Sequence, residues 1–269
     1  MVRSLSFYYS RGTTPALKVR NMNQTQISVI IPVHNSAATI RQAIDSVLAQ
    51  SEKAEIYVID DASTDEPERA LLPYMEREDF HLIRNEDNLG VAKSRMKGVA
   101  AASTPYIAFL DADDWWAEGK LSRQLSEMIS EGAVLSSTGR ELMKSDGQST
   151  GRCIGLPRRI DQKAILKQNH LNCSGVMVRR DVMLEFPMEH DDSHEDYISW
   201  IRIITKYGWA LGIDEPFLKY RLSEKGKSRN KLKSAVMNFK VYRYCGFSIP
   251  KSLICFISYA VGGVKKYYF

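Results

Sequence analysis

Short β-rich apolar runs alternate with segments of helical periodicity between Ile27 and Leu110. We expect strands over Ile27–Val33, Glu55–Ile59, Phe80–Ile83 and Tyr106–Leu110, and helices over Ala37–Ala49, Arg69–Met75 and Gly90–Ala102. The strand-like runs are nearly continuous in apolar residues, which is typical of strands buried on both faces. Because helices follow the strands in turn, the sequence predicts right-handed crossovers and an α/β fold, with a doubly wound, mostly parallel sheet flanked by helices.

The alternation weakens after Trp116, although the pattern still indicates elements that extend the sheet. The expected helices are Lys120–Ile129, His194–Tyr207 and Lys231–Tyr244, the expected strands are Ala133–Thr138, Val176–Val178, Trp209–Ile213 and Phe217–Arg221, and Lys144–Arg152 is expected to be a polar turn. No linker separates this half from the first, so we expect both halves to fold together.

Composition excludes several classes of protein. With 44% apolar and 26% charged residues, the chain can form a packed core and is neither collagen-like nor wholly disordered. The four cysteines are scattered without a CxxC pair, which indicates a reducing compartment and no disulfide framework. No apolar run reaches the roughly 18 residues that a membrane-spanning helix needs. We therefore predict a cytoplasmic protein.

Polar side chains follow three of the predicted strands. His34 and Asn35 follow the first strand, Asp60 and Asp61 the second, and Asp111 and Asp113 the fourth. In open α/β sheets, ligands bind at the carboxyl ends of the strands. The sequence therefore predicts a ligand site at this edge of the sheet.

Asp111 and Asp113, with Asp114 beside them, offer hard oxygen ligands directly after a buried strand. Such ligands suit Mg²⁺ or Mn²⁺, in particular an ion that also binds phosphate oxygens. Phosphate-transferring hydrolases have a similar DxDx(T/V) motif on their first strand, but here Trp115 stands in place of Thr or Val. We therefore favour a metal and phosphate site.

Two further segments indicate a nucleotide. The carboxylates of Asp60 and Asp61 can accept hydrogen bonds from a nucleobase or a ribose, although the alternative is a segment that only caps the next helix through Ser63 or Thr64. Asn88–Arg95 opens a helix, and a helix N-terminus favours anions. Neither GxGxxG nor GxxxxGK[ST] occurs, which disfavours a dinucleotide oxidoreductase or a P-loop enzyme.

Acids also gather in His190–Asp196, at the start of a predicted helix. The helix macrodipole stabilises acids at this position, so the cluster could be purely structural. A metal site is a weaker alternative, because no second group of His or Cys supports it. A carboxylate held here could also act as a general base on a hydroxyl nucleophile.

Four of these segments resemble glycosyltransferase family 2, whose members have the GT-A fold. They are Ile30–Asn35, Val58–Asp65, Asn88–Arg95 and Phe109–Asp114, and their shared order and spacing are far more specific than each motif alone. The resemblance is strong over 27–125 and continues more loosely to about 245, through Glu195–Asp196 and Tyr220–Arg221. The later half looks most like bacterial enzymes that build capsule, O-antigen or teichuronic-type polysaccharides.

The resemblance implies a domain organisation. A Rossmann-like GT-A catalytic domain would cover 27–225, with a nucleotide-sugar half over 27–125 and an acceptor half over 126–225. From the residues themselves, we expect 1–26 to be a disordered leader, since it lacks a continuous apolar run, and 226–269 to be a basic, amphipathic helical tail.

The resemblance also implies an inverting, metal-dependent transfer of a sugar, most often from a UDP-sugar, to a hydroxyl of a saccharide or lipid-linked acceptor. Asp196 would be the catalytic base with Glu195 beside it, and Asp113 would bind Mn²⁺ or Mg²⁺. The nucleotide pocket would be formed by Pro32, His34, Asn35, Asp60, Asp61, Gly90, Arg95 and Asp111. Arg221, Lys227 and Ser228 would close over the diphosphate. His34 stands where an aromatic residue is common in the family, which leaves a strict preference for uridine open.

Two alternatives share much of this pattern. A nucleotidyltransferase acting on sugar phosphates would show a Gly-rich loop with Arg or Lys after the first strand, and Pro32–Ser36 has none. A catalytically silent partner protein with the same fold would have lost a metal or base carboxylate. Asp111, Asp113, Glu195 and Asp196 are all present.

The C-terminal part of the chain is basic. Residues 219–269 contain 12 basic residues and the single acid Glu224, whereas residues 23–218 contain 21 basic and 31 acidic residues. Leu253–Val261 is apolar, too short to span a membrane, and flanked by basic and aromatic residues, as interfacial helices are. One expectation is peripheral contact with an anionic membrane, on the inner face of the cell membrane, and the other is a helix packed on the domain. No nucleic-acid partner is expected.

Overall fold

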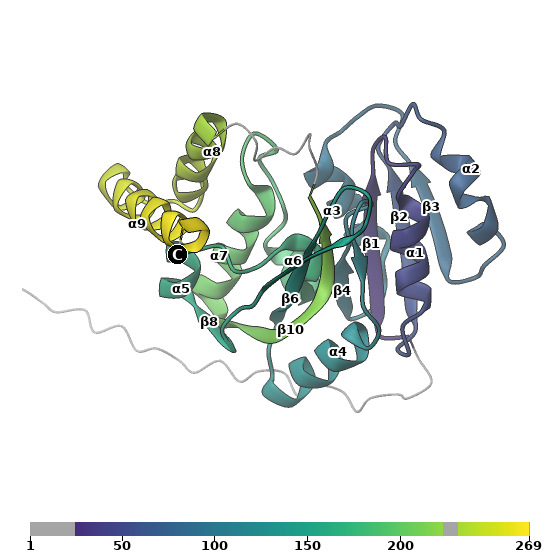
Figure 1. The fold of residues 1–269 in the computed structure, drawn as a ribbon, viewed down its shortest axis with the longest axis horizontal. Coiled ribbons are helices and arrows are strands. Elements are labelled where there is room, and N and C mark those ends of the chain that lie inside the picture. The colour runs from purple at the N-terminus through teal and green to yellow at the C-terminus, as the bar shows by residue number, and fades with distance from the viewer. Residues whose placement is uncertain (1–24, 223–230, 269) are drawn as a thin grey trace, which may run out of the picture.

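Eight strands of one mixed sheet follow the order β3-β2-β1-β4-β9-β6-β10-β5, while β7 pairs with β6 and β8 pairs with β10 (Figure 1). The computed structural model describes the backbone of residues 25–222 and 231–268, and the side chains of residues 25–222 and 235–259. Residues 1–24 of the expected leader therefore lie outside the described part of the chain.

The first four strands are parallel, as the sequence predicts. They are β1 (Ile27–Val33), β2 (Ala54–Asp60), β3 (Phe80–Arg84) and β4 (Tyr106–Phe109). The helices between them are α1 (Ile40–Leu48), α2 (Pro67–Leu71), the 3₁₀ turn η1 (Leu72–Tyr74) and α3 (Val91–Ala101). The expected doubly wound arrangement is confirmed.

The second half extends the sheet with strands of both directions. Its strands are β5 (Trp115–Trp116), β6 (Leu135–Met143), β7 (Ser149–Ile154), β8 (Arg159–Asp161), β9 (Met177–Arg179) and β10 (Trp209–Arg221). β9 is antiparallel to both β4 and β6, while β6 and β10 are parallel to each other. The helical elements are α4 (Lys120–Glu131), α5 (Gln162–Lys167), η2 (Cys173–Gly175), α6 (Arg180–Glu185), α7 (Glu195–Tyr207), α8 (Lys231–Tyr244) and α9 (Ile249–Tyr268).

Two apolar layers cover the two faces of the sheet. Alternate residues of a strand point to opposite faces, so Val29 and Ile31 of β1 pack with α1 and α4, whereas Ile30 packs with α3 and α7. All of these residues are fully buried. The strand ends are thereby held rigidly, which fixes the loops that carry the polar residues.

Three local predictions are wrong. The segments Trp209–Ile213 and Phe217–Arg221 form the single strand β10, whose register against β6 shifts between Ile213 and Leu218. Pro216 lies in this irregular stretch, where a residue without an N–H group does not break the ladder. Part of the expected polar turn over Lys144–Arg152 belongs to β7, which pairs with β6.

The third wrong prediction concerns the start of α2. Its N-cap is Glu66, without a side-chain cap bond, and Pro67 begins the helix. The Ser63 hydroxyl, which was expected as a possible cap, instead accepts a hydrogen bond from the Asn35 N–H at 3.1 Å. A proline is pre-organised for the first helical position, so this helix does not need a hydroxyl cap.

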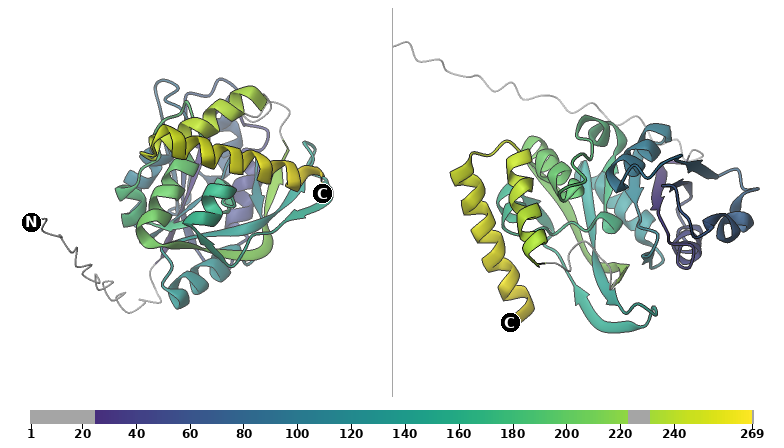
Figure 2. Two further views of the ribbon diagram at one scale, coloured as in Figure 1. Left: turned by 90° about the vertical axis from the view of Figure 1, so that its left-hand side faces the viewer. Right: turned by 90° about the horizontal axis from the view of Figure 1, so that it is seen from above.

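Helices α8 and α9 lie together at the end of the molecule opposite α2 (Figures 1 and 2). Helices are therefore present where the sequence predicts a helical tail. The four cysteines of the chain are free. Within residues 25–222 and 231–268, every helix is too short or too polar to cross a membrane.

Candidate active site

The loop after β4 and the first turn of α7 meet at one buried guanidinium group. Arg95 of α3 donates to Asp111 Oδ1 at 2.6 Å and to Glu195 Oε1 at 3.0 Å. The positive charge of Arg95 thus joins the acid after β4 to the acid at the start of α7. Two acidic segments that are far apart in the sequence therefore belong to one site.

The two acids at the start of α7 have different surroundings. Glu195 is buried, and its charge is paired with Arg95. Asp196 accepts a hydrogen bond from the Tyr197 N–H at 2.7 Å. Burial, and then the neighbouring Glu195 carboxylate, raise the pKa of Asp196 to about 7, and Arg95 offsets this only in part. A carboxylate with a pKa near neutrality has the proton affinity that suits a general base.

Asp113 fits a divalent cation that arrives with phosphate ligands. Burial and the nearby Asp111 carboxylate raise the pKa of Asp113, while Arg221 lowers it. Two neighbouring carboxylates repel each other when both are ionised, and a bound cation would relieve this repulsion. Among the described side chains, no three His, Cys, Asp or Glu residues are grouped so that they could hold a metal. Mg²⁺ typically takes one or two protein carboxylates and completes its shell with substrate phosphates and water, so the residues present are compatible with such an ion.

Arg221, at the end of β10, lies directly beside Asp113. Its Nε donates to the carbonyl oxygen of Asp113 at 2.8 Å, and its other nitrogens donate to Ser145 O at 2.7 Å and to Gln42 Oε1 at 2.6 Å. These three acceptors are neutral, so the guanidinium brings positive charge to the region beside Asp113. Arg is suited to binding phosphate in such a position.

The neighbouring Asp114 has a structural environment. It is buried, and its Oδ1 accepts the Arg221 N–H at 2.9 Å, which ties the end of β10 to the loop after β4. Lys227 and Ser228, the other residues expected to close over the diphosphate, lie outside the described residues.

Asp61 holds the loop that precedes α3. Its Oδ1 accepts hydrogen bonds from the Leu89 N–H and from Asn85 Nδ2, both at 2.8 Å, and its Oδ2 accepts the Gly90 N–H at 2.9 Å. Burial opposes ionisation of Asp61, but the hydrogen bonds outweigh it and lower its pKa. Oδ2 still has a lone pair with which it can accept a further bond. Contact between Asp61 and a nucleobase therefore stays a prediction.

His34 and Asn35 connect the ends of the strands. The Nδ1–H of His34 donates to Asp61 O at 2.8 Å, and its Nε2 can then accept from Asn88 Nδ2 at 3.1 Å. Asn35 has φ 53°, and its Oδ1 accepts the Thr64 N–H at 2.9 Å. These two residues thus shape the same loops that would contact a nucleotide.

Pro32 and Asp60, two further predicted nucleotide-binding residues, are buried at the ends of neighbouring strands. Pro32 is buried in β1, in register with Ile59 of β2. Asp60 is buried as well, and its Oδ1 accepts the Ser63 N–H at 3.0 Å. Both residues support the surface of the site from below.

The N-terminus of α3 is occupied by a carboxylate of the protein itself. Asp191 Oδ1 accepts the Ala92 N–H at 3.0 Å. Gly90 has φ +91°, and a Cβ atom there would lie 2.5 Å from Asp191 Oδ2, so only glycine permits this approach. The anion expected at this helix terminus is therefore, in this structure, the side chain of Asp191.

The segment 190–193 is also held from its other side by α8. The His190 and Tyr244 rings stack with centroids 3.8 Å apart, Asp192 pairs with Lys240 at 2.6 Å, and the Ser193 hydroxyl donates to Met237 O at 3.0 Å. The segment that leads into Glu195 and Asp196 is thus fixed between α3 and α8.

We predict that Asp191→Ala lowers the free energy of unfolding by about 1 kcal/mol, the usual cost of losing a side-chain acceptor at a helix N-terminus. Asp191→Asn keeps an acceptor oxygen and should lose less. Denaturant unfolding measures both changes. The control is Asp192→Ala, which removes an exposed ion pair with Lys240 and a hydrogen bond from the Tyr244 hydroxyl, and which should cost less than Asp191→Ala. Equal losses for Asp191→Ala and Asp192→Ala would contradict the capping role.

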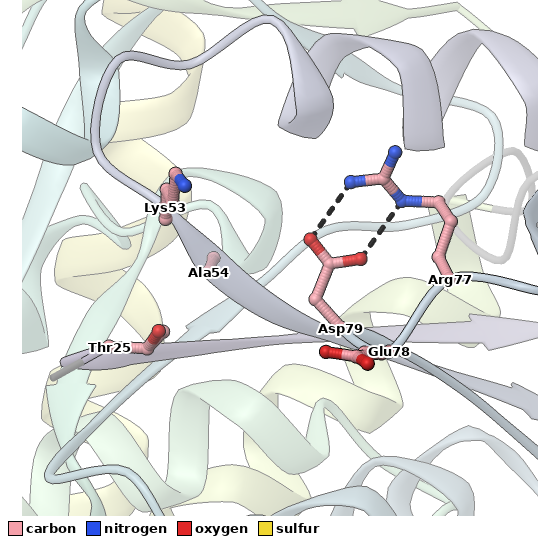
Figure 3. A pocket seen from close by; sticks show the side chains of 6 residues that line it. All are labelled: Thr25, Lys53, Ala54, Arg77, Glu78 and Asp79. Carbon is pink, nitrogen blue, oxygen red and sulfur yellow. Dashed lines mark hydrogen bonds and ion pairs between the residues drawn. The ribbon is translucent and has the colours of Figure 1, made fainter.

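A surface hollow of about 380 Å³ lies at the opposite edge of the sheet (Figure 3). It is lined by Thr25, Lys53, Ala54, Arg77, Glu78 and Asp79. These residues surround the amino ends of β1, β2 and β3, and Arg77 is paired with Asp79 through two bonds of 2.9 Å. Since ligands in such sheets bind at the carboxyl ends of the strands, we assign no function to this hollow.

Known proteins are similar to this chain in sequence. Residues 28–185 match the family described as Glycosyl transferase family 2. TuaG of Bacillus subtilis (strain 168), named as a teichuronic acid biosynthesis glycosyltransferase, is 33% identical over 243 residues, which cover 89% of this chain and 96% of TuaG. WfaP of Escherichia coli, named as a UDP-Glc:alpha-D-GlcNAc-diphosphoundecaprenol beta-1,3-glucosyltransferase, is 30% identical over 244 residues, which cover 90% of this chain and 96% of WfaP.

Solved structures give the same fold at low sequence identity. S. aureus TarS 1-349 in complex with UDP-GlcNAc aligns with a TM-score of 0.70 at 15% identity, over 89% of this chain and 73% of that one. The mannosyltransferase PcManGT from Pyrobaculum calidifontis, in complex with GDP-Man and Mn²⁺, aligns with a TM-score of 0.67 at 15% identity, over 91% of this chain and 76% of that one.

The fold is thus the GT-A fold, and the protein is a glycosyltransferase. The chain belongs to glycosyl transferase family 2, as its motifs predict.

Proposed function

We propose that the protein transfers a sugar, with inversion, from a UDP-sugar to a hydroxyl of a lipid-linked saccharide during the synthesis of a cell-surface polysaccharide. The names of TuaG and WfaP support this class of donor, acceptor and product. Both relatives are similar to this chain over nearly their whole length.

The observation that carries the proposal is the pair of ion contacts made by Arg95. One guanidinium joins Asp111, two residues before the proposed metal ligand, to Glu195, the neighbour of the proposed base. Inverting transfer needs a base on the face of the sugar opposite the leaving diphosphate. The Arg95 contacts hold the segment with the proposed base and the segment with the proposed metal ligand at a fixed separation, which meets this need.

The roles of the individual residues follow from their surroundings. Asp196, with its raised pKa, would accept the proton of the acceptor hydroxyl, while Glu195 and Arg95 would keep the base in place. Arg221 would bind the diphosphate beside Asp113. Asp113 would hold Mn²⁺ or Mg²⁺, and such an ion neutralises the charge that develops on a leaving diphosphate.

The remaining predicted residues would form the nucleoside side of the site. Asp61 has an oxygen with spare accepting capacity, and His34 and Asn35 shape the loops around it. Asp111, whose Oδ1 accepts a hydrogen bond from Arg95 at 2.6 Å, would contact the ribose or the sugar.

A donor screen tests the proposal. The purified chain is incubated with UDP-, GDP-, CDP- and dTDP-sugars, with Mn²⁺ or with a chelator, and the released nucleoside diphosphate is measured. We expect slow release from one UDP-sugar that depends on the metal and that stops with chelator. Absence of release from every donor, together with absence of nucleotide binding in calorimetry, would favour a catalytically silent protein.

A further inference from the structure

The outward face of α9 is apolar, although this helix lies at the surface. Ile249, Leu253, Ile254 and Ile257 are 63%, 50%, 69% and 54% exposed. Ile249, Leu253 and Ile257 recur every four residues, so they form a stripe along the helix, with Ile254 beside it. A contiguous group of large aliphatic side chains in solvent marks an interaction surface, in contrast to single exposed residues. We call these four residues the α9 stripe.

The opposite face of α9 packs on the body of the enzyme. Ser252 is fully buried, the Phe256 ring lies 6.3 Å from that of Phe239 on α8, and the Tyr259 ring lies 6.2 Å from that of Tyr197 on α7. These inner residues follow helical spacing on a different side of the helix from Leu253, Ile254 and Ile257. Turning the stripe inward would break this packing, so the stripe faces away from the body. Figure 2 accordingly shows α9 as the outermost element at its end of the molecule.

The chain segment that carries the α9 stripe is basic. Residues 231–269 contain seven basic residues and no acid. Of the described basic side chains, Arg243 and Lys251 are exposed, and the Lys251 amine lies 4.1 Å from the centre of the Phe247 ring. Apolar side chains with basic residues beside them are complementary to an anionic lipid surface, where the former enter the acyl boundary and the latter meet the headgroups.

A second copy of the chain is a less suitable occupant. In a two-fold symmetric dimer through α9, the same surface patch would meet itself. The basic residues around the two stripes would then face each other, and like charges would oppose the association. The charge pattern therefore favours an anionic partner over self-association.

We propose that the α9 stripe docks the protein on an anionic lipid surface, with α9 lying along the interface. The helix pair that would dock also contacts the active-site region, since Lys240 of α8 pairs with Asp192, close before Glu195 and Asp196. Docking of this kind does not depend on the proposed sugar transfer.

The experiment uses the full chain and vesicles of phosphatidylcholine, with or without phosphatidylglycerol. The double variant Leu253→Ser/Ile257→Ser removes the centre of the stripe, and both positions are at least half exposed, so the core is not affected. The matched control is Leu72→Ser/Leu184→Ser, because these leucines are 67% and 43% exposed on other elements. Wild type and control should cosediment with the anionic vesicles. The double variant should bind these vesicles at least about tenfold more weakly than wild type. Added salt should weaken binding of the wild type.

Several outcomes would overturn the proposal. It fails if wild type stays in the supernatant with anionic vesicles at low salt, or if the double variant, shown by circular dichroism to be folded, binds as well as the control. Light scattering distinguishes the remaining case. If wild type is a dimer and the double variant is a monomer, the stripe forms a contact between two copies of the chain, and the lipid proposal is wrong. Release of nucleoside diphosphate without vesicles should be the same for wild type and double variant, so failure of the sugar-transfer proposal remains distinguishable from failure of docking.

Discussion

Asp196→Asn should lower kcat by about 10³-fold, within the range that removal of a general base usually costs. The asparagine keeps the shape of the side chain and an oxygen for the Tyr197 N–H, but it cannot take a proton. Donor binding, which this residue does not serve in the proposal, should remain. The measurement is transfer to acceptor, followed by release of nucleoside diphosphate, together with donor affinity from calorimetry.

The matched control is Asp192→Asn, four residues earlier in the same segment. Asp192 is exposed and pairs with Lys240, so its substitution should leave kcat within about twofold of wild type. Full activity of Asp196→Asn, or an equal loss in both variants, would show that Asp196 is not the base.

The pH profile gives an independent readout of the same residue. A general base must be ionised to act, and the pKa of Asp196 is raised to about 7, first by burial and then by Glu195. The rate should therefore rise as the pH increases toward about 7 and level off above it. The residual rate of Asp196→Asn should lack this rise. A wild-type profile that is already flat from about pH 5 upward would be incompatible with a base of raised pKa.

Local patterns were sufficient to predict the parallel half of the sheet and the edge that carries the site. Each of β1, β2 and β4 belongs to a short, largely buried apolar run that ends in polar residues, so both the strand and its end are visible in the sequence. The sequence also predicts β9, as Val176–Val178, but it does not predict the antiparallel strands β5 and β8, which have two and three residues. Runs of that length carry no measurable periodicity, and only their tertiary neighbours make them strands.

The sequence predicted which residues belong to the site better than it predicted the contacts between them. The resemblance placed Arg95 in the nucleotide pocket, whereas the structure buries its guanidinium between Asp111 and Glu195. Ser174 had no signal at all, although its hydroxyl accepts the Asp111 N–H at 3.1 Å. Asp191 was visible as part of an acidic cluster, but its partner at Ala92 depends on how two distant loops pack. Periodicity and spacing report on local structure, so pairings between distant segments lie beyond them.

Asp113→Asn should abolish the metal dependence of donor turnover and lower release of nucleoside diphosphate by about 10³-fold, in line with the several kcal/mol that a metal ion contributes to a leaving diphosphate. The amide has nearly the same shape as the carboxylate but lacks the charge that would attract the cation. Titration of wild type and variant with Mn²⁺, in the presence of a fixed concentration of UDP, measures the loss. We expect Mn²⁺ to strengthen UDP binding to wild type and to leave binding to the variant unchanged.

Unfolding of the variant can be excluded on physical grounds and by experiment. Burial and Asp111 raise the pKa of Asp113 in the folded state, so its ionisation at neutral pH opposes folding. Asp113→Asn cannot ionise and should therefore have a Tm at least as high as that of wild type. The matched control is Asp79→Asn, in the hollow at the opposite edge of the sheet, which should retain metal-dependent turnover (Figure 3). If Asp113→Asn still responds to Mn²⁺ as wild type does, the cation is held elsewhere, and the assignment of Asp113 is wrong.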